Sequence, residues 1–361
     1  MPDIKVVIGA NYGDEGKGLV SGCLAREAAQ ENKSILTVFF NGTVQRCHTY
    51  QGEKLHCIGA GDLHGGDTYY HPMFVVDPIA LWLTNTMVYI DPLCRLILPC
   101  DVVKNRETET KRGAARHGSC GFGLFEAVKR CANPRYSIVY GDLQYPALVY
   151  EKITAIQNEY NSDLENDELY NLTNWFKATQ YLLKYCPSRI LRDIYYKYDT
   201  IIYEGGQGLL LSQKNVGDFP HLTPSCTGAT NIAKEISGLN CETDIYYVSR
   251  SYMTRHGNGP MEYECAKDDI NSTIVDKTNQ ANEWQGSLRF GFLNQEKLLE
   301  RVKNDFATYH EGVRAHMVYT QLNYTDNKLC VGKNKLEEIE KPNFISSVYG
   351  SNKEDEMFKA L

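Results

Sequence analysis

A glycine-rich segment near the amino terminus contains the residues most suited to chemistry in this sequence. Residues 13–18 read GDEGKG and place Lys17 directly after a glycine, as in loops that bind nucleotide phosphates. Glycines let backbone N–H groups approach phosphate oxygens closely, and the lysine adds a positive charge. The standard GxxxxGK[ST] pattern is incomplete, because Asn11 occupies the first glycine position and Gly18 replaces the hydroxyl residue. The segment therefore indicates phosphate chemistry without a standard Walker loop.

Asp14 is an unfavourable neighbour for a phosphate, because two negative charges repel each other. A metal ion or a substrate proton would compensate its carboxylate. The alternative is a structural turn with a solvated Asp-Glu pair, and the loop alone favours chemistry only slightly over that alternative.

Two later segments and one histidine are further candidates. Residues 204–208 (EGGQG) contain Gln207, whose amide could recognise a small molecule; the alternative is a tight turn with a surface glutamine. Residues 286–291 (GSLRFG) contain Arg289, a candidate clamp for a carboxylate, although a solvated surface arginine is the favoured reading of this segment alone. His48 could act as a general acid or base, but a lone histidine is more often structural.

These segments must be positioned by buried strands and helices. Residues 4–8 (IKVVI) predict a buried strand directly before GDEGKG, and residues 19–30 predict a helix after it. The other predicted elements are strands at 34–40, 199–203 and 244–248, and helical structure over 157–195. This order predicts an α/β fold with a large, mostly parallel central sheet flanked by helices and a P-loop-like nucleotide site. No repeat, biased tract or linker divides the sequence, so we expect one domain, 1–361, with long functional loops.

Composition narrows the functional class. The formal net charge is -7, which argues against holding a nucleic-acid backbone by charge. The 12 cysteines form no CxxC pair and no zinc-site spacing, which favours scattered reduced thiols. The amino terminus lacks the pattern of a signal peptide, and no apolar run is long enough to span a bilayer. We expect a cytoplasmic protein with no nucleic-acid or membrane partner.

Taken in order, five segments resemble motifs of the adenylosuccinate synthetase family. The family opens with GDEGKG, as this chain does. Its GHNAGHT, EGAQG, YPYVTSSNT and TRVGAGP resemble residues 41–49 (NGTVQRCHT), 204–208 (EGGQG), 219–227 (FPHLTPSCT) and 254–260 (TRHGNGP). The resemblance covers nearly the whole chain, and five motifs in the same order are very improbable by chance.

The resemblance implies a ligase that joins L-aspartate to a 6-oxopurine nucleotide. In this family a nucleoside triphosphate first phosphorylates the purine O6, and the aspartate amine then displaces phosphate, which is a good leaving group. The family requires Mg²⁺ and forms homodimers that share active sites, and its substrates are small molecules. The resemblance makes Asp14 the base that takes the purine N1 proton, His48 an acid on the transferring phosphoryl group, and Lys17 a phosphate ligand.

The resemblance also assigns the remaining binding residues. For nucleotide and phosphate binding they are Gly13, Glu15, Gly16, Gly18, Thr49, Gln321, Asn323 and Gly350. For the acceptor nucleotide they are Asp14, Gln45, Ser119, Cys120, Arg130, Gln207 and Thr223, with Arg130 reaching the substrate phosphate of a partner subunit. For aspartate they are Gln285, Gly286, Ser287 and Arg289, and for the metal Asp14 and the backbone carbonyl of Cys47.

One departure from the family concerns the phosphate donor. The family's TKLD, whose aspartate accepts two hydrogen bonds from guanine, becomes TQLN at residues 320–323. Asn323 offers one acceptor and one donor, which matches adenine. We therefore predict ATP or dATP in place of GTP. The alternative is that this stretch does not touch the base.

The other departures cluster around the acceptor nucleotide and aspartate. The family's TTGRPRR aligns with residues 284–290 (WQGSLRF), so two arginines become Ser287 and Phe290. Residues 45–47 (QRC) stand where the family has Asn-Ala-Gly, and residues 119–124 (SCGFGL) stand where the family has TTGRGIGP. These changes resemble a viral branch that acts on dGMP and makes the succinyl precursor of 2-aminoadenine for phage DNA in the host cytoplasm. Some viral members carry Ser-Thr where this chain keeps Asp14-Glu15, so IMP remains the alternative to dGMP.

Two other classes of protein fit the sequence less well. A nucleotide kinase would need a hydroxyl residue after Lys17, and Gly18 stands there. A catalytically inactive nucleotide-binding protein would be expected to lack Asp14, Lys17 or His48, and all three are present.

Overall fold

The computed structural model describes residues 1–361 except 83–87, 161–166, 240, 277, 280, 282, 310–311 and 354–355. Its α-helices are α1 (Lys17–Gln30), α2 (Pro78–Trp82), α3 (Pro99–Arg112), α4 (Leu124–Cys131), α5 (Pro146–Tyr160), α6 (Leu172–Tyr185), α7 (Ala233–Leu239), α8 (Lys267–Ile270) and α9 (Gln295–Phe306). Short 3-10 helices cover Ala60–His64, Gly113–Ala115, Tyr140–Gln144, Leu191–Asp193, Tyr195–Lys197, Leu209–Leu211, Val216–Asp218, Ala229–Asn231 and Leu322–Tyr324.

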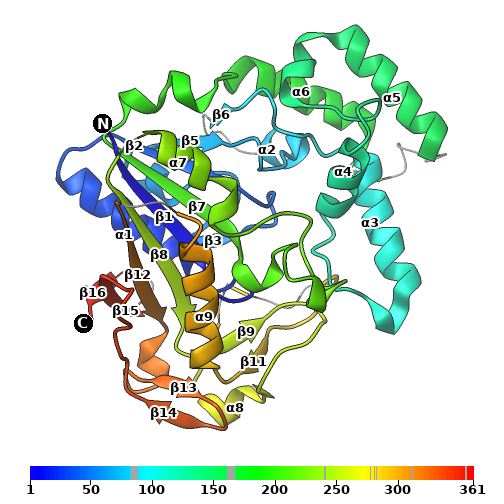
Figure 1. Ribbon diagram of the computed structural model, residues 1–361. Coiled ribbons are helices and arrows are strands. Elements are labelled where there is room, and N and C mark those ends of the chain that lie inside the picture. Colours follow the sequence, from blue (N-terminus) through cyan, green and yellow to red (C-terminus); the bar gives the residue numbers. More distant parts are fainter. Residues whose placement is uncertain are drawn as a thin grey trace.

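A nine-stranded sheet forms the centre of the molecule (Figure 1). Its strands in spatial order are β16 (Glu356–Lys359), β15 (Ser347–Lys353), β12 (Val313–Thr320), β8 (Thr243–Arg250), β1 (Asp3–Gly9), β7 (Thr200–Gly208), β2 (Ile35–Phe39), β5 (Asp67–Tyr70) and β6 (Val88–Ile90). Every pairing is parallel except that of β16 with β15. The predicted mostly parallel sheet is confirmed.

Three small sheets lie outside the central one. They contain β9 (Met253–Arg255), β10 (Glu264–Cys265) and β11 (Arg289–Gly291); β13 (Leu329–Val331) and β14 (Lys335–Glu337); and β3 (His48–Tyr50) and β4 (Glu53–Leu55). Figure 1 shows β9 and β11 beyond the lower end of the central strands, close to the loops that carry the predicted site.

Successive apolar side chains of β1 point to opposite faces of the sheet, so both faces must be covered by helices. Val6 and Ile8 join the core that also contains α9, whereas Val7 joins the core beneath α1. Successive side chains of a strand point to opposite faces, so a central strand buried on both faces must be apolar throughout. A third core holds α2 and most of α3 to α6, which Figure 1 places together on one side of the sheet.

Most of the predicted elements are confirmed, with two corrections. The strand at 4–8, the helix at 19–30 and the strands at 34–40 and 244–248 correspond to β1, α1, β2 and β8. The segment 204–208 is not a loop, because β7 continues through it to Gly208 and pairs with β1 to its end. The helical prediction for 157–195 covers the end of α5, α6 and two 3-10 turns, and part of it lies outside the described residues.

The cysteines behave as the sequence predicts. All 12 are free thiols, and none is exposed. Within the described ranges, no helix has both the length and the apolar composition needed to cross a membrane.

Candidate active site

The GDEGKG loop is organised by its own glutamate. The buried Glu15 carboxylate accepts hydrogen bonds from the backbone N–H groups of Asn11, at 2.9 Å, and Gly13, at 2.8 Å. Its other oxygen pairs with the Lys17 ammonium at 2.8 Å, and that ammonium also donates to the Gly13 carbonyl. The Glu15 side chain therefore shapes the loop from inside, and its predicted contact with phosphate would come from the backbone amide. Lys17 is held at the same time beside the first turn of α1.

Close packing fixes the position of this loop against two other elements. Gly16 adopts a φ of 97° at the start of α1, in the left-handed region that favours glycine. The Thr320 hydroxyl at the end of β12 donates to the Glu15 carbonyl at 2.6 Å. A Cβ added at Gly18 would lie 2.5 Å from the Cβ of His48, so only glycine allows β3 to come this close to α1. This contact explains why the hydroxyl residue of a Walker loop is absent here.

Asp14 projects from the same loop toward a group of cations. Burial raises the pKa of Asp14, although His256, Arg250 and Lys17 act to lower it. Arg250, at the end of β8, donates to the Asp14 backbone carbonyl at 2.6 Å and leaves the carboxylate available. In the described part of the chain, no cation forms an ion pair with that carboxylate. A carboxylate whose pKa is raised is a stronger base than an ordinary aspartate, which suits proton transfer.

His48 lies in a buried cluster with a glutamate and an arginine. Its Nδ1 lies 2.5 Å from Glu204 Oε1 in β7 and 2.7 Å from Arg46 Nη2, and Arg46 also forms an ion pair with Glu204. Burial, Arg46 and Lys17 together lower the pKa of His48, so the imidazole is neutral at pH 7. The guanidinium of Arg46 stacks over the Phe39 ring, 3.5 Å from its centroid. The cluster leaves His48 Nε2 as the atom available to a ligand.

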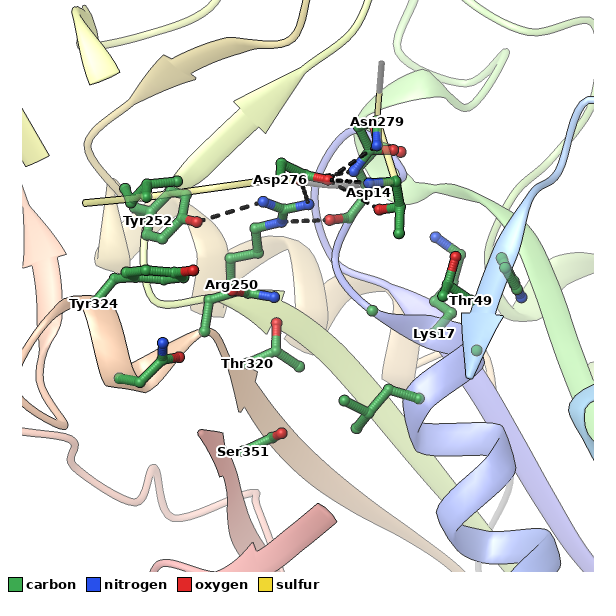
Figure 2. Close-up of a pocket in the computed structure, with 18 of the residues that line it drawn as sticks. Asp14, Lys17, Thr49, Arg250, Tyr252, Asp276, Asn279, Thr320, Tyr324 and Ser351 are labelled. Atoms are coloured by element: carbon green, nitrogen blue, oxygen red, sulfur yellow. Dashed lines mark hydrogen bonds and ion pairs between the residues drawn. The ribbon is translucent and has the colours of Figure 1, made fainter. Parts of the chain in front are cut away.

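A cavity of about 480 Å³ opens beside the loop, and Figure 2 shows the side chains around it. Asp14, Lys17, His48 and Thr49 line one side, and Gln321 and Asn323 line the other. Tyr252, Tyr324, Ser351 and Asn352 complete the wall away from the loop. The structure thus brings the residues predicted to contact the nucleobase of the phosphate donor, Gln321 and Asn323, into the same cavity as the predicted phosphate loop. Gly350 lies in β15 packed against Leu322 and Phe358, one residue before this wall.

A second cavity, of about 220 Å³, brings together most of the predicted acceptor residues. Its lining includes Gln45, Ser119, Cys120, Gln207 and Thr223. A third cavity, of about 320 Å³, joins Asp14 to this region and is lined also by Gln45, Cys47, Cys120 and Gln285. Residues from five distant parts of the sequence therefore converge around Asp14.

Several buried polar atoms without partners belong to residues that line these cavities. They include His48 Nε2, Thr49 Oγ1, Gln207 Oε1, Thr223 Oγ1 and His256 Nδ1, none of which has a hydrogen-bond partner among the described residues. Buried polar groups in proteins are nearly always paired, so such orphans need an explanation. A polar ligand that fills the cavities would supply the missing partners.

Arg130 is not positioned to reach a phosphate of another subunit, which corrects its predicted role. It is 1% exposed, and its guanidinium binds the Asp101 carboxylate and the carbonyls of Leu96 and Tyr136. These bonds tie α4 to the start of α3 inside the protomer. The sequence alignment in this region is loose, which explains the misassignment.

Arg289 also differs from its predicted role as a clamp for aspartate. Its guanidinium pairs with Glu264 across the small sheet and donates to the carbonyls of Gly257, at 2.9 Å, and Gly259, at 3.0 Å. Gly286 and Ser287 are exposed and line none of the three cavities. Of the four predicted aspartate residues, the structure places Gln285 at the cavity next to Asp14.

Several site residues were missed by the sequence. Glu204 was noted only as part of a glycine-rich segment, and Arg46 only as a departure from the family. Arg250 and Asp276 form an ion pair at 2.8 Å on the wall of the 480 Å³ cavity. The position of Arg250 at the carboxyl end of a predicted strand was the one signal available, because ligands bind at that edge of parallel sheets.

Comparisons with known proteins agree with this geometry. The family model described as Adenylosuccinate synthetase matches residues 6–303. The adenylosuccinate synthetase of Neisseria gonorrhoeae is 28% identical over 311 residues, an alignment that covers 79% of this chain and 70% of that protein.

Two solved structures share the fold. The fully ligated adenylosuccinate synthetase from Plasmodium falciparum has a TM-score of 0.69 at 20% identity, covering 99% of this chain and 86% of that one. The cyanophage S-2L succinoaminodeoxyadenylate synthetase, bound to dGMP and dATP, has a TM-score of 0.62 at 17% identity, covering 90% and 86%.

Proposed function

Because the chain belongs to the adenylosuccinate synthetase family of C–N ligases, which join aspartate to a purine nucleotide, we propose that its acceptor is dGMP and its donor is ATP or dATP. The product would be 2-amino-2′-deoxy-N6-succinyladenylate. The observation that carries a nucleotide ligase here is the convergence of unpartnered buried polar atoms on connected cavities around Asp14.

The proposed donor preference rests on Asn323. Its amide lies on the wall of the 480 Å³ cavity, on the side opposite the phosphate loop. One acceptor and one donor match the adenine edge, whereas a carboxylate would match the two donors of guanine. ATP and dATP share that edge, so both are proposed.

The proposed acceptor rests on the amide groups of the second cavity. Gln207 and Gln45 lie together over Gly42, where an added Cβ would be 3.9 Å from each of them. The unpartnered Gln207 Oε1 is a hydrogen-bond acceptor, and guanine carries a 2-amino donor that hypoxanthine lacks. The cyanophage S-2L structure, which shares this fold, was determined with dGMP and dATP.

Within this proposal, named side chains act in two chemical steps, the phosphorylation of O6 and the displacement of phosphate by aspartate. Asp14 takes the N1 proton of the purine, so that negative charge develops on O6; O6 attacks the γ-phosphorus of the donor, and the bond from that phosphorus to the bridging oxygen breaks to release ADP or dADP. In the tautomer that lets neutral His48 donate from Nε2 to an oxygen of the transferring phosphoryl group, Nδ1 accepts from Arg46, which Glu204 holds by an ion pair. Phosphate then leaves C6 as the aspartate nitrogen attacks that carbon. Lys17 and the loop amides stabilise the phosphate charge.

The family's magnesium requirement fits these residues. The Asp14 carboxylate forms no ion pair in the described part of the chain, and Cys47 lines the same two cavities as Asp14. A Mg²⁺ site commonly uses one or two carboxylates together with substrate phosphates. The ion would neutralise charge on the transferring phosphoryl group.

IMP is the second candidate acceptor. The curated relative from Neisseria gonorrhoeae is named adenylosuccinate synthetase, and this chain keeps the Asp14-Glu15 pair that some viral members replace. Homodimerisation, a cytoplasmic location and a single-domain organisation also remain proposals.

The deciding experiment is a matrix of acceptors and donors. Purified protein with Mg²⁺ and L-aspartate is given dGMP or IMP, each with ATP, dATP or GTP, and phosphate release is followed. We expect turnover with dGMP and either adenine donor. Turnover with IMP but not dGMP would reject the acceptor, and a preference for GTP would reject the donor.

A further inference from the structure

The aspartate site of this chain needs a cation that the predicted residues do not supply. L-Aspartate brings two carboxylates, and buried carboxylates are usually paired with arginine or lysine. Two family arginines are Ser287 and Phe290 here, and Arg289 is bound to Glu264 and two backbone carbonyls. A third family arginine, in the GRG of TTGRGIGP, is replaced by Phe122.

The 320 Å³ cavity next to Asp14 contains such a cation on a different element. Arg106 of α3 lines it together with Asp14, His256 and Gln285, and it is the sole lysine or arginine on that lining within the described residues. The cavity volume lies within the usual range for small-molecule sites. Asp14 is on the same lining, so one cavity contains both Arg106 and the residue proposed to contact the purine.

Arg106 is held by contacts that leave donors to spare. Its Nε donates to the Gly121 carbonyl at 3.2 Å, and its Nη1 donates to Asp167 at 3.0 Å. The guanidinium also lies 6.0 Å from the ring centroid of Trp284, next to Gln285. A guanidinium has five N–H donors in a fixed plane, and these two bonds use two of them. Asp167 forms an ion pair with the guanidinium, and the remaining N–H groups are the donors that could bind a carboxylate of a ligand.

We propose that Arg106 binds a carboxylate of L-aspartate in this cavity and so replaces the arginines that the chain lacks. The proposal rests on the ligase function proposed above. It gives α3 a direct part in amino-acid specificity. It also explains why a chain with Ser287 and Phe290 in the aspartate segment can still select a dianionic amino acid.

The test measures KM for each substrate in Arg106→Gln and Arg106→Lys. Charge-assisted bidentate bonds to carboxylates are strong, so we expect the KM for aspartate to rise about 10- to 100-fold in Arg106→Gln. The KM values for both nucleotides should stay within about twofold. Arg106→Lys should recover part of the loss, because a point charge remains but the planar fork does not.

Two arginines serve as matched controls. Arg116 lies on Trp284 as well, 5.7 Å from its ring centroid, but lines none of the three cavities, so Arg116→Gln should leave the aspartate KM unchanged. Arg289→Gln tests the alternative that Arg289 binds a carboxylate of aspartate. The proposal is overturned if Arg289→Gln raises the aspartate KM and Arg106→Gln does not. An equal rise in all three KM values for Arg106→Gln would also overturn it, because that pattern indicates a structural role.

The outcome is separable from the choice of acceptor. All variants are assayed with whichever acceptor the unmodified protein turns over, so a failure of dGMP leaves the Arg106 comparison intact. Thermal unfolding of each variant shows whether it is folded. If Arg106→Gln does not fold, the comparison of Arg106→Lys with the unmodified protein decides, with an unchanged aspartate KM counting against the proposal.

Discussion

Replacing Gly18 by alanine should remove most of the activity while leaving the fold intact. An ideal Cβ at this position would lie 2.5 Å from the Cβ of His48, 3.2 Å from its Cγ and 3.3 Å from its Cα. Carbon atoms in contact normally lie about 3.5–4.0 Å apart. The atoms in conflict are the backbone and stem of His48, which cannot rotate away, so β3 must move by roughly 1 Å to restore ordinary contact.

This movement should have a small effect on the free energy of unfolding and a large effect on kcat. Overpacking costs about 1–3 kcal/mol, and the better helix propensity of alanine returns up to about 1 kcal/mol. Net destabilisation of about 0–3 kcal/mol follows from these two terms. A misplacement of about 1 Å at a catalytic group can cost on the order of 100-fold in rate. We therefore expect kcat to fall about 100-fold, with a shift of only a few degrees in Tm.

Gly22→Ala is the matched control in the same helix. Its added Cβ would lie 2.5 Å from ring atoms of Tyr50, so the clash and the helix propensity gain are comparable. The conflict there is with the side-chain ring of Tyr50, which lies on the same strand but can shift without moving its backbone, so we expect similar destabilisation with a much smaller loss of kcat. Steady-state kinetics and thermal unfolding of both variants check this. A Gly18→Ala enzyme within threefold of normal kcat, or equal losses in both variants, would refute the reasoning.

Three further predictions concern the donor, the base and a buried acid. Asn323→Asp should shift the ratio of kcat/KM for GTP over ATP upward by about 10- to 100-fold, since each good base contact is worth about 1–3 kcal/mol; an unchanged ratio means that residue 323 does not touch the base. Asp14→Asn should lower kcat by about 10²- to 10⁴-fold, the usual contribution of a general base, with unfolding unchanged, and near-normal turnover would remove Asp14 from that role. Burial raises the pKa of Asp77 to about 6, while its oxygens accept from the Tyr170 hydroxyl, at 2.8 Å, and from two backbone N–H groups. Because its pKa is raised, Asp77 stabilises the fold fully at a pH below its ordinary pKa and loses that contribution as the pH rises through about 6. The free energy of unfolding of the unmodified protein should therefore fall by on the order of 3 kcal/mol relative to that of Asp77→Asn between about pH 4 and about pH 7. Denaturant titrations in which the two proteins have parallel pH profiles would contradict this.

The sequence by itself determined the framework and the chemistry of the first loop. The apolar run at residues 4–8, the glycines of GDEGKG and the periodic helix after them are local features, and β1, the loop and α1 follow them closely. Strand, loop and helix signals depend on residues near one another in the chain, so they can be read without the fold. The order of the motifs likewise identifies the family, which the family model matching residues 6–303 confirms.

Tertiary structure decided which charges are available to substrates. Glu204 meets His48 across 156 residues, and no spacing in the sequence announces that contact. Arg130 and Arg289 look like free cations in the sequence, yet each is bound to an acidic side chain and to backbone carbonyls in the fold. Arg106, which no motif singles out, is also paired with an acidic side chain, Asp167, but it lines the cavity that Asp14 lines. The sequence shows that a charge exists, but only three-dimensional packing determines whether an opposite charge already occupies it, because ion pairs form between groups that are close in space and not along the chain.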